Sequence, residues 1–365
     1  MRKVTQTDSK NEIALPAQKL AAVFKDAEGS AELVNLIYVS DSEPGITREK
    51  EGADFVYVFK YREIKDKTVL KRIRSLVLPP AWENVWICAN PDGHLQATGI
   101  DAMGRKQYRY HAMWNTVRNE TKFHHLYEFG KVLPQIRERL HKDLSLPGLP
   151  MEKVLATIVS LMQCTCIRIG SNAYEKLYGS YGRTTLKDKH VSFSGATMEF
   201  KFKGKKGVLH DISMHNKHLA HIVKQCQDIP GKELFQFLDA DGKHHKVESG
   251  MVNNYIKEVS GGEFTAKDFR TWAGSLHAIE AFMELGDAKT ESGLKKNVVA
   301  ALDKVAEHLG NTRMVCKKYY VHPIVIDHYM NKTIKKYLAK AEKNKDCDTS
   351  SLLSAEEQLL MEMIK

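Results

Sequence analysis

The sequence predicts an α+β protein of two domains: a small, mainly β N-terminal domain and a mostly α domain with a three-stranded β element. Three observations support this prediction. At 365 residues, the chain is longer than most single domains. Its first third alternates strand-like runs with turns, and from about Trp114 apolar residues recur at helical spacing. We place the boundaries at 1–113, 114–335 and 336–365, the last being a lysine-rich helical tail.

The N-terminal strands are predicted from aromatic and β-branched runs between turn residues. Residues 55–59 form such a run after a turn at 41–45. Residues 85–88 and 95–98 are expected to pair around the turn at 90–93, and 106–110 to form a strand after the turn at 101–104. Pro79 and Pro80 exclude a regular helix across this part of the chain.

The second domain begins with an apolar stripe at helical spacing, formed by Phe123, Leu126, Tyr127, Val132, Leu133, Ile136 and Leu140. Residues 154–166 are apolar on nearly all sides, which predicts a buried helix. Runs at 191–193, 198–202 and 208–209 predict the β element, and helices are expected from about 215 to 340. A capping signal at 354–357 predicts a last short helix, which we expect to be solvated.

Charge and cysteine content indicate the partner and the compartment. The formal net charge of +10 fits an acidic polymer as partner, although it also fits a merely basic protein. None of the six cysteines forms a CxxC pair, which favours a reducing compartment. The chain has no run of about 18 apolar residues and no apolar signal-peptide core, so we expect a cytoplasmic protein close to the nucleoid, with no membrane partner.

Five polar residues of the second domain are of the types that DNA strand cleavage requires. Attack on a phosphodiester needs cations for the non-bridging oxygens, a nucleophile, and a proton donor for the leaving oxygen. Arginine suits the first task because it stays charged and binds phosphate through two N–H groups. The candidates are Arg168, Lys205, Arg270, Asn311 and Tyr320. Taken singly, each is more often structural, and Tyr320 alone would usually be a packing residue.

The order and local sequence of these residues resemble the type IB DNA topoisomerases, specifically the poxvirus-like group found in bacteria. Arg168 precedes Ile-Gly, Lys205 follows a glycine on a predicted hairpin, and Arg270 follows Lys-Asp-Phe. Asn311 lies nine residues before Tyr320, at a position that carries His or Asn in the family. Segments 79–82, 95–99 and 104–110 are similar to the family's N-terminal signature, so the resemblance covers roughly residues 38–330.

The resemblance implies a role for each residue. Arg168, Arg270 and Asn311 would bind the scissile phosphate, with Lys267 assisting the phosphate or the proton transfer. Lys205 would be the general acid toward the 5′ oxygen, and Tyr320 would attack to give a 3′-phosphotyrosyl enzyme, with adjacent Tyr319 as its competitor. DNA contacts would come from Arg105, Lys106, Gln107, Tyr108, Tyr110 and Tyr174. Ile100 and Met103 depart from the basic residues usual there, which puts some phosphate contacts in question.

We therefore expect a monomer that closes two lobes around double-stranded DNA and relaxes positive and negative supercoils without ATP or metal. No Gly-Lys-Ser or Gly-Lys-Thr occurs, which excludes a Walker A loop. Residues 239–242 are expected to form a hairpin turn, and His215, His218 and His221 to spread around a helix rather than bind a metal. A tyrosine recombinase is one alternative, disfavoured by Lys267 where recombinases usually carry His. A non-catalytic DNA-binding protein is the other, disfavoured because all five active-site positions are filled.

Overall fold

The computed structural model describes residues 31–32, 34–52, 54–102, 104–170, 175, 179–334, 336–337 and 352–365. The chain divides into two compact units, one up to His125 and one from Leu126 onward, and helix α4 (Ala112–Leu144) runs across the division. The first unit is β-rich and the second mostly helical, which confirms the predicted α+β class. The predicted boundaries near 113 and 335 stay predictions. Met103, Tyr174, Cys347 and the stretch 338–351 lie outside the described residues.

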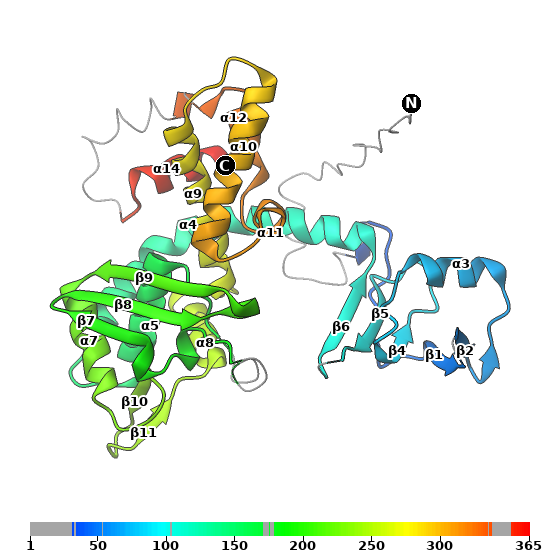
Figure 1. Ribbon diagram of the computed structural model, residues 1–365, viewed down its shortest axis with the longest axis horizontal. Helices are drawn as coiled ribbons and strands as arrows, with labels where there is room; N and C mark the ends of the chain where they lie inside the picture. The colour runs from blue at the N-terminus through cyan, green and yellow to red at the C-terminus, as the bar shows by residue number, and fades with distance from the viewer. Residues whose placement is uncertain are drawn as a thin grey trace. The chain divides into compact units, whose positions relative to one another are not determined.

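A single antiparallel sheet dominates the first unit (Figure 1). Its strand order is β3-β2-β1-β4-β5-β6, so that β6 lies at an edge. The strands are β1 (Ile46–Glu51), β2 (Asp54–Phe59), β3 (Arg62–Glu63), β4 (Glu83–Ile87), β5 (Leu95–Ile100) and β6 (Lys106–Tyr110). The strands predicted at 55–59, 85–88, 95–98 and 106–110 are confirmed as β2, β4, β5 and β6.

Helix α3 (Lys67–Ser75) packs on this sheet through a small apolar core. Asp66 begins the helix by accepting hydrogen bonds from the amides of Thr68 and Val69, which are otherwise unpaired donors at the helix start. Ile73 on its inner side is buried with Ile46 and Ile87 of the sheet. The residues between α3 and β4, all of them described, form no regular helix, as the two prolines require.

The second unit contains the C-terminal part of α4 and a set of helices around a three-stranded sheet (Figure 1). The helices are α5 (Met151–Thr165), α7 (Lys217–Gln227), α8 (Ser249–Ser260), α9 (Ala266–Leu285), α10 (Glu291–Leu309), α11 (Arg313–Tyr319), α12 (Pro323–Met330) and α14 (Ala355–Ile364). Single 3-10 turns occur at η1 (Arg183–Thr185), η2 (Asp188–His190) and η3 (Lys205–Gly207). The sheet is built from β7 (Val191–Ser194), β8 (Thr197–Lys203) and β9 (Leu209–His215), in that order.

Helix α5 is the buried centre of this unit, as its sequence predicts. It contacts α7, α8 and α9. Ala156, Ile158, Val159 and Leu161 are fully buried within it. Because α5 is packed on nearly every side, the residues that follow it are held in a fixed place, and Arg168 is one of them.

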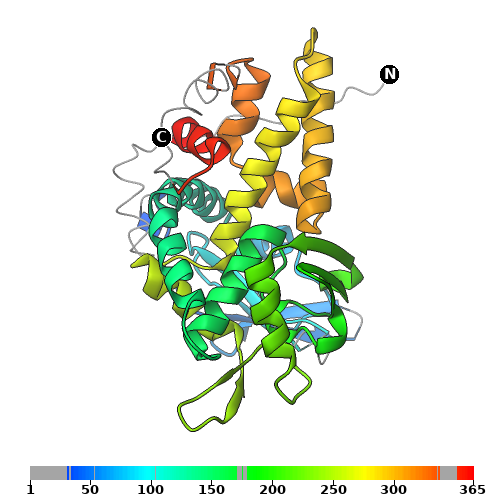
Figure 2. The same ribbon diagram turned by 90° about the vertical axis from the view of Figure 1, so that its left-hand side faces the viewer.

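Two expectations for the C-terminal half are wrong. The helices do not continue unbroken from 215, because β10 (Gln236–Leu238) and β11 (His244–Lys246) form a hairpin whose turn is the predicted one at 239–242. The last helix, α14, is not a solvated end helix. Its Leu359, Leu360 and Met363 are buried, and it packs against α9, as Figure 2 shows in red and yellow. Leu359 and Leu360 each lie about one helical turn before Met363, a spacing that indicates a buried helix face.

Within the described residues, no helix is both long enough and apolar enough to cross a membrane.

Candidate active site

The second unit brings Arg168, Arg270, Asn311 and Tyr320 together from segments far apart in the sequence. Arg168 follows the end of α5, Arg270 lies in the second turn of α9, and Asn311 follows the left-handed cap of α10 at Gly310. Tyr320 is the first residue beyond α11. Each predicted residue therefore lies at or near a helix end, where backbone from a neighbouring element can approach it.

The Arg168 guanidinium group joins the end of α5 to the end of α10. Its Nη2 atom donates to Asn311 Oδ1 at 2.6 Å and to the Gly310 carbonyl at 3.1 Å. Burial lowers the pKa of Arg168, and the nearby charge of Arg270 lowers it further. Two cations held close together in a partly buried place favour the binding of an anion between them.

The Arg270 side chain is buried and binds the backbone on both sides of it. Its Nη1 atom donates to the Cys166 carbonyl, and its Nη2 atom donates to the Leu309 carbonyl at 2.7 Å. Among the described residues, Arg270 Nε and Asn311 Nδ2 are buried donors with no hydrogen-bond partner. Buried donors are rarely left unpaired, so these two atoms mark where an acceptor oxygen fits.

Tyr320, rather than Tyr319, lies against this cluster. The Arg270 guanidinium carbon is 5.3 Å from the centroid of the Tyr320 ring. The absence of a side chain at Gly274 on α9 allows this approach, because a Cβ there would come within 2.5 Å of the Tyr320 carbonyl oxygen. Tyr319 is 37% exposed and has the Lys318 ammonium over its ring, at 5.3 Å from the centroid.

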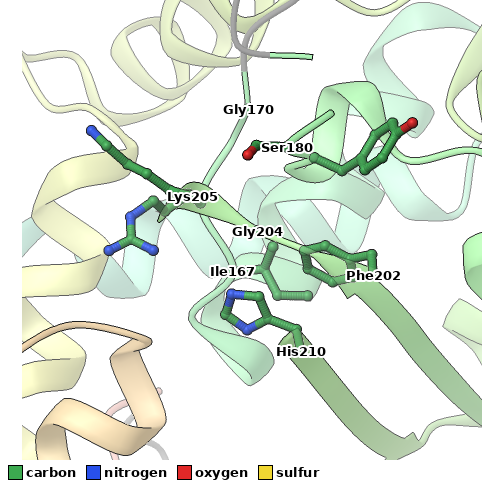
Figure 3. A pocket seen from close by; sticks show the side chains of 9 residues that line it. Ile167, Gly170, Ser180, Phe202, Gly204, Lys205 and His210 are labelled. Atoms are coloured by element: carbon green, nitrogen blue, oxygen red, sulfur yellow. The ribbon is translucent and has the colours of Figure 1, made fainter. Parts of the chain in front are cut away.

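Lys205 lies at the tip of the β8–β9 connection, beside a pocket of about 180 Å³. The pocket is lined by Arg168, Lys205, His210 and the end of β8, which puts the lysine and the first arginine on one cavity. Figure 3 shows the Lys205 side chain extending away from Phe202 and His210. Lys267 is exposed and lies one turn before Arg270 on α9, at the start of that helix.

His210 is a residue of this pocket that the sequence did not indicate. Its ring stacks on Phe202 with centroids 4.9 Å apart, and burial with the charges of Arg168 and Arg270 lowers its pKa. The His210 ring is in close contact with two glycines, and any side chain at either would collide with it. A Cβ at Gly204 would come within 2.6 Å of the ring, and a Cβ at Gly310 within 2.8 Å. His210 therefore lies between the glycine before Lys205 and the glycine before Asn311.

Comparison of the sequence with known proteins identifies the family. Residues 111–347 match the family model of the eukaryotic DNA topoisomerase I catalytic core, and residues 54–101 match that of the bacterial DNA topoisomerase IB N-terminal domain. The DNA topoisomerase 1B of Acanthamoeba polyphaga mimivirus is 34% identical over 296 residues, which cover 79% of this chain and 88% of the viral protein. The chain belongs to the type IB DNA topoisomerases.

Poxvirus proteins are similar to this topoisomerase at lower identity. DNA topoisomerase 1B of Vaccinia virus (strain Copenhagen) and DNA topoisomerase I of Monkeypox virus are each 25% identical over 246 residues. These cover 66% of this chain and 74% of each viral protein. The enzyme is therefore a poxvirus-like type IB DNA topoisomerase, and its substrate is DNA.

In the first unit of the topoisomerase, the predicted DNA-contacting residues lie on and beside the edge strand β6. Tyr108 and Tyr110 stack with centroids 6.0 Å apart, and Tyr108 is 50% exposed. Arg105 and Gln107 both bind Asp101, at 2.7 Å each, and Lys106 pairs with Asp41 at 2.5 Å. The acidic partners hold the basic side chains in place while neutralising part of their charge.

Neither metal-like motif of the sequence forms a metal site in the part of the topoisomerase that the structure describes. No group of three or more candidate ligands converges there. His215, His218 and His221 are exposed, but the expectation that they share one helix is wrong for His215, which ends β9, while the other two lie on α7. Asp239 accepts backbone hydrogen bonds from Asp241 and Lys243 and so closes the β10–β11 turn.

Proposed function

We propose that this topoisomerase relaxes positive and negative supercoils by cutting and resealing one strand of duplex DNA through Tyr320. The cluster of Arg168, Arg270 and Asn311 around the tyrosine supports the proposal. It offers two guanidinium groups whose acceptors, among the described residues, are carbonyl and amide oxygens rather than carboxylates. A scissile phosphate would supply the missing negative charge.

In the proposed reaction, the phenol of Tyr320 loses its proton to water, its oxygen attacks the phosphorus, and the bond from phosphorus to the 5′ oxygen breaks. Arg168, Arg270 and the Nδ2 atom of Asn311 hold the non-bridging oxygens, whose charge grows in the transition state. Lys205 gives a proton to the leaving 5′ oxygen. The product is a 3′-phosphotyrosyl enzyme, and attack by the 5′ hydroxyl reverses the step. Lys267, exposed at the start of α9, assists either the binding of the phosphate or the proton transfer.

Neither ATP nor a metal ion enters this scheme. The phosphotyrosyl bond retains the free energy of the phosphodiester, and fixed cations take the place of a metal at the phosphate. On the first unit, Arg105, Lys106, Gln107, Tyr108 and Tyr110, together with Tyr174 of the second unit, would contact the sugar–phosphate backbone and groove of the duplex. Phosphates would then compete with Asp101 and Asp41 for the basic side chains.

We also propose that the enzyme acts as a monomer on nucleoid DNA in the cytoplasm. All the proposed catalytic side chains come from one compact unit of one chain, so the chemistry needs no second copy. The described cysteines are free thiols, in keeping with a reducing compartment.

The deciding experiment is relaxation of supercoiled plasmid in EDTA without ATP, comparing wild type with Tyr320→Phe. Wild type should relax plasmids of both superhelical signs, while the variant should bind DNA without relaxing it. Loss of wild-type activity in EDTA would contradict the metal-independent scheme. Resolution of Holliday junctions without plasmid relaxation would favour a recombinase, and absence of any covalent protein–DNA adduct would favour a non-catalytic role.

A further inference from the structure

Near the active-site Arg270, the side chains of Cys166, His277 and Glu280 contact one another in that order. Cys166 Sγ is 3.9 Å from His277 Nε2, and His277 Nδ1 is 2.7 Å from Glu280 Oε2. His277 and Glu280 share one face of α9, and Cys166 caps the end of α5. The proposed cleavage reaction uses none of these side chains.

Two basic side chains, His277 and Arg183, interact electrostatically with Cys166. Although burial disfavours the charged ring, contacts with Cys166 and Glu280 raise the pKa of His277 to about 9. The pairing with His277 lowers the pKa of Glu280. Arg183 is only 1% exposed, and its burial lowers its pKa. The charges of Cys164 and Cys166 partly offset this lowering. The His277 Nε2 atom, 3.9 Å from the Cys166 sulfur, can take the thiol proton and so give the thiolate, which is the reactive form.

For each of the other described cysteines, burial is the largest influence on the pKa of the thiol. Burial raises the pKa of Cys226 to about 12 and that of Cys316 to about 11, and it also raises the pKa of Cys88 and Cys164. Cys164 is nevertheless exposed at the surface, two residues from Cys166. It therefore offers a matched comparison, since it is more exposed than Cys166, whereas the imidazole contact of 3.9 Å is made by the Cys166 sulfur.

Cys166 also contacts the active-site residue Arg270 through its backbone. Its carbonyl accepts the hydrogen bond from Arg270 Nη1 while its sulfur contacts His277, two turns further along α9. Its backbone has the left-handed φ of 52°, which a non-glycine residue adopts only when its surroundings hold it there. A larger or more polar group on the sulfur would therefore disturb the carbonyl that orients Arg270.

We propose that Cys166 is a peroxide-sensitive site, and that its oxidation to the sulfenic acid reversibly stops DNA cleavage. The thiolate attacks one oxygen of hydrogen peroxide, an S–O bond forms and the O–O bond breaks. The departing hydroxide takes the proton from His277 and leaves as water, so that sulfur is oxidised by two electrons and the peroxide is reduced. Cys166 is buried, with 7% of its surface exposed, and the adjacent His277 side chain is 25% exposed, so we expect a small oxidant to reach the sulfur beside the imidazole.

The oxidation of Cys166 is inferred only from the contacts among Cys166, His277 and Glu280. Its effect on DNA cleavage also rests on the proposed function, in which Arg270 binds the scissile phosphate. The test treats the full chain with hydrogen peroxide, traps sulfenic acid with dimedone, and locates the adduct by peptide mass spectrometry. We expect labelling at Cys166 at least tenfold faster than at Cys164, and at least tenfold slower labelling of Cys166 in His277→Gln. Labelling confined to Cys164, or none at Cys166, would overturn the proposal.

A second readout follows the rate of covalent adduct formation with a DNA duplex. Peroxide should lower the rate at least tenfold, dithiothreitol should restore it, and Cys164→Ser should respond as wild type does. Labelled Cys166 with an unchanged rate would overturn the coupling to cleavage. If untreated enzyme formed no adduct with DNA, the proposed function would fail, while the labelling result would still decide the Cys166 proposal.

Discussion

Arg168 Nη2 donates a hydrogen bond to Asn311 Oδ1 at 2.6 Å, and this contact decides which end of the amide can act on a substrate. Because the oxygen is taken, the Nδ2 atom is left as a buried donor without a partner among the described residues. The arginine thus orients the amide toward an anion, in addition to carrying charge itself.

Asn311→Ala and Asn311→Asp separate these two effects. Loss of one donor to the transition state should lower the cleavage rate about 10²- to 10³-fold in the alanine variant. The aspartate variant should be at least as slow, because its carboxylate would pair with Arg168 and repel the phosphate. Single-turnover cleavage of a DNA duplex measures both rates. An aspartate variant faster than the alanine variant would contradict this orientation of the amide.

The two adjacent tyrosines provide a matched pair of variants. Tyr320→Phe should form no covalent adduct with DNA, because the ring that lies against Arg270 would have lost its hydroxyl. Tyr319→Phe should keep cleavage within about threefold of wild type, because its ring is partly exposed and packs with Lys318. Gel separation of protein–DNA adducts gives the answer, and an adduct in Tyr320→Phe would move the nucleophile to Tyr319.

The sequence predicted much of this site because type and spacing carry the information there. Asn311 lies nine positions before Tyr320, and a single helix, α11, lies between them with a cap at each end. The choice of Tyr320 over Tyr319 rested on register alone, and the position of the Arg270 guanidinium group now supports it.

What the sequence could not predict depends on packing between distant segments. His210 is an ordinary strand residue until the glycines at 204 and 310 are seen on either side of its ring. In α14 the apolar spacing indicates a buried face, but the burial of Glu357 could not be predicted, because its partners Arg137 and Trp272 lie more than 80 residues away in sequence. The turn at 239–242 could be predicted, but the strands β10 and β11 on either side of it could not, because each is only three residues long.

Lys205→Ala tests the proton donor. The variant should cleave ordinary DNA about 10²- to 10⁴-fold more slowly, since the 5′ oxygen would leave as an unprotonated alkoxide. On a substrate with sulfur at the 5′ bridging position, a better leaving group, the same variant should approach the wild-type rate. Single-turnover cleavage of the two substrates measures this difference. Equal slowing on both would remove Lys205 as the general acid.

Gly310→Ala tests the fit of His210 against the residue before Asn311. Gly310 and Gly261 both end helices in the left-handed region, with φ of 56° and 64°, so alanine at either should cost about 1 kcal/mol of stability. A Cβ at Gly261 meets nothing within 4 Å, whereas at Gly310 it meets the His210 ring at 2.8 Å. We therefore expect only Gly310→Ala to lower the cleavage rate, by at least tenfold, and thermal unfolding to show whether both are folded. Equal rates in the two variants would contradict this.

Glu357 connects the last helix to α4 and α9 through hydrogen bonds from Arg137 and Trp272. We expect the ionisation of Glu357 to contribute to the pH dependence of the free energy of unfolding in acid. Its carboxylate accepts two hydrogen bonds from Arg137, at 2.7 and 2.8 Å, and one from Trp272 Nε1 at 3.0 Å. Burial raises the pKa of Glu357, but the bonds from Arg137 outweigh it, so the pKa in the folded state is below 4.5. The stabilisation is therefore complete above the unfolded-state pKa and is lost as pH falls through the lower, folded-state pKa.

Glu357→Gln should accordingly lower the free energy of unfolding by about 1–3 kcal/mol at pH 7, because Arg137 would lose its buried counter-charge. The difference from wild type should shrink as pH falls below 4.5, since the wild-type carboxylate then becomes protonated. Glu291→Gln is the control, because Glu291 pairs with Lys295 on the exposed face of α10 and should change stability by less than about 0.5 kcal/mol. Urea unfolding at pH 7 and at lower pH measures both variants, and a Glu357→Gln effect that stayed constant with pH would show that the ion pair does not stabilise the folded state.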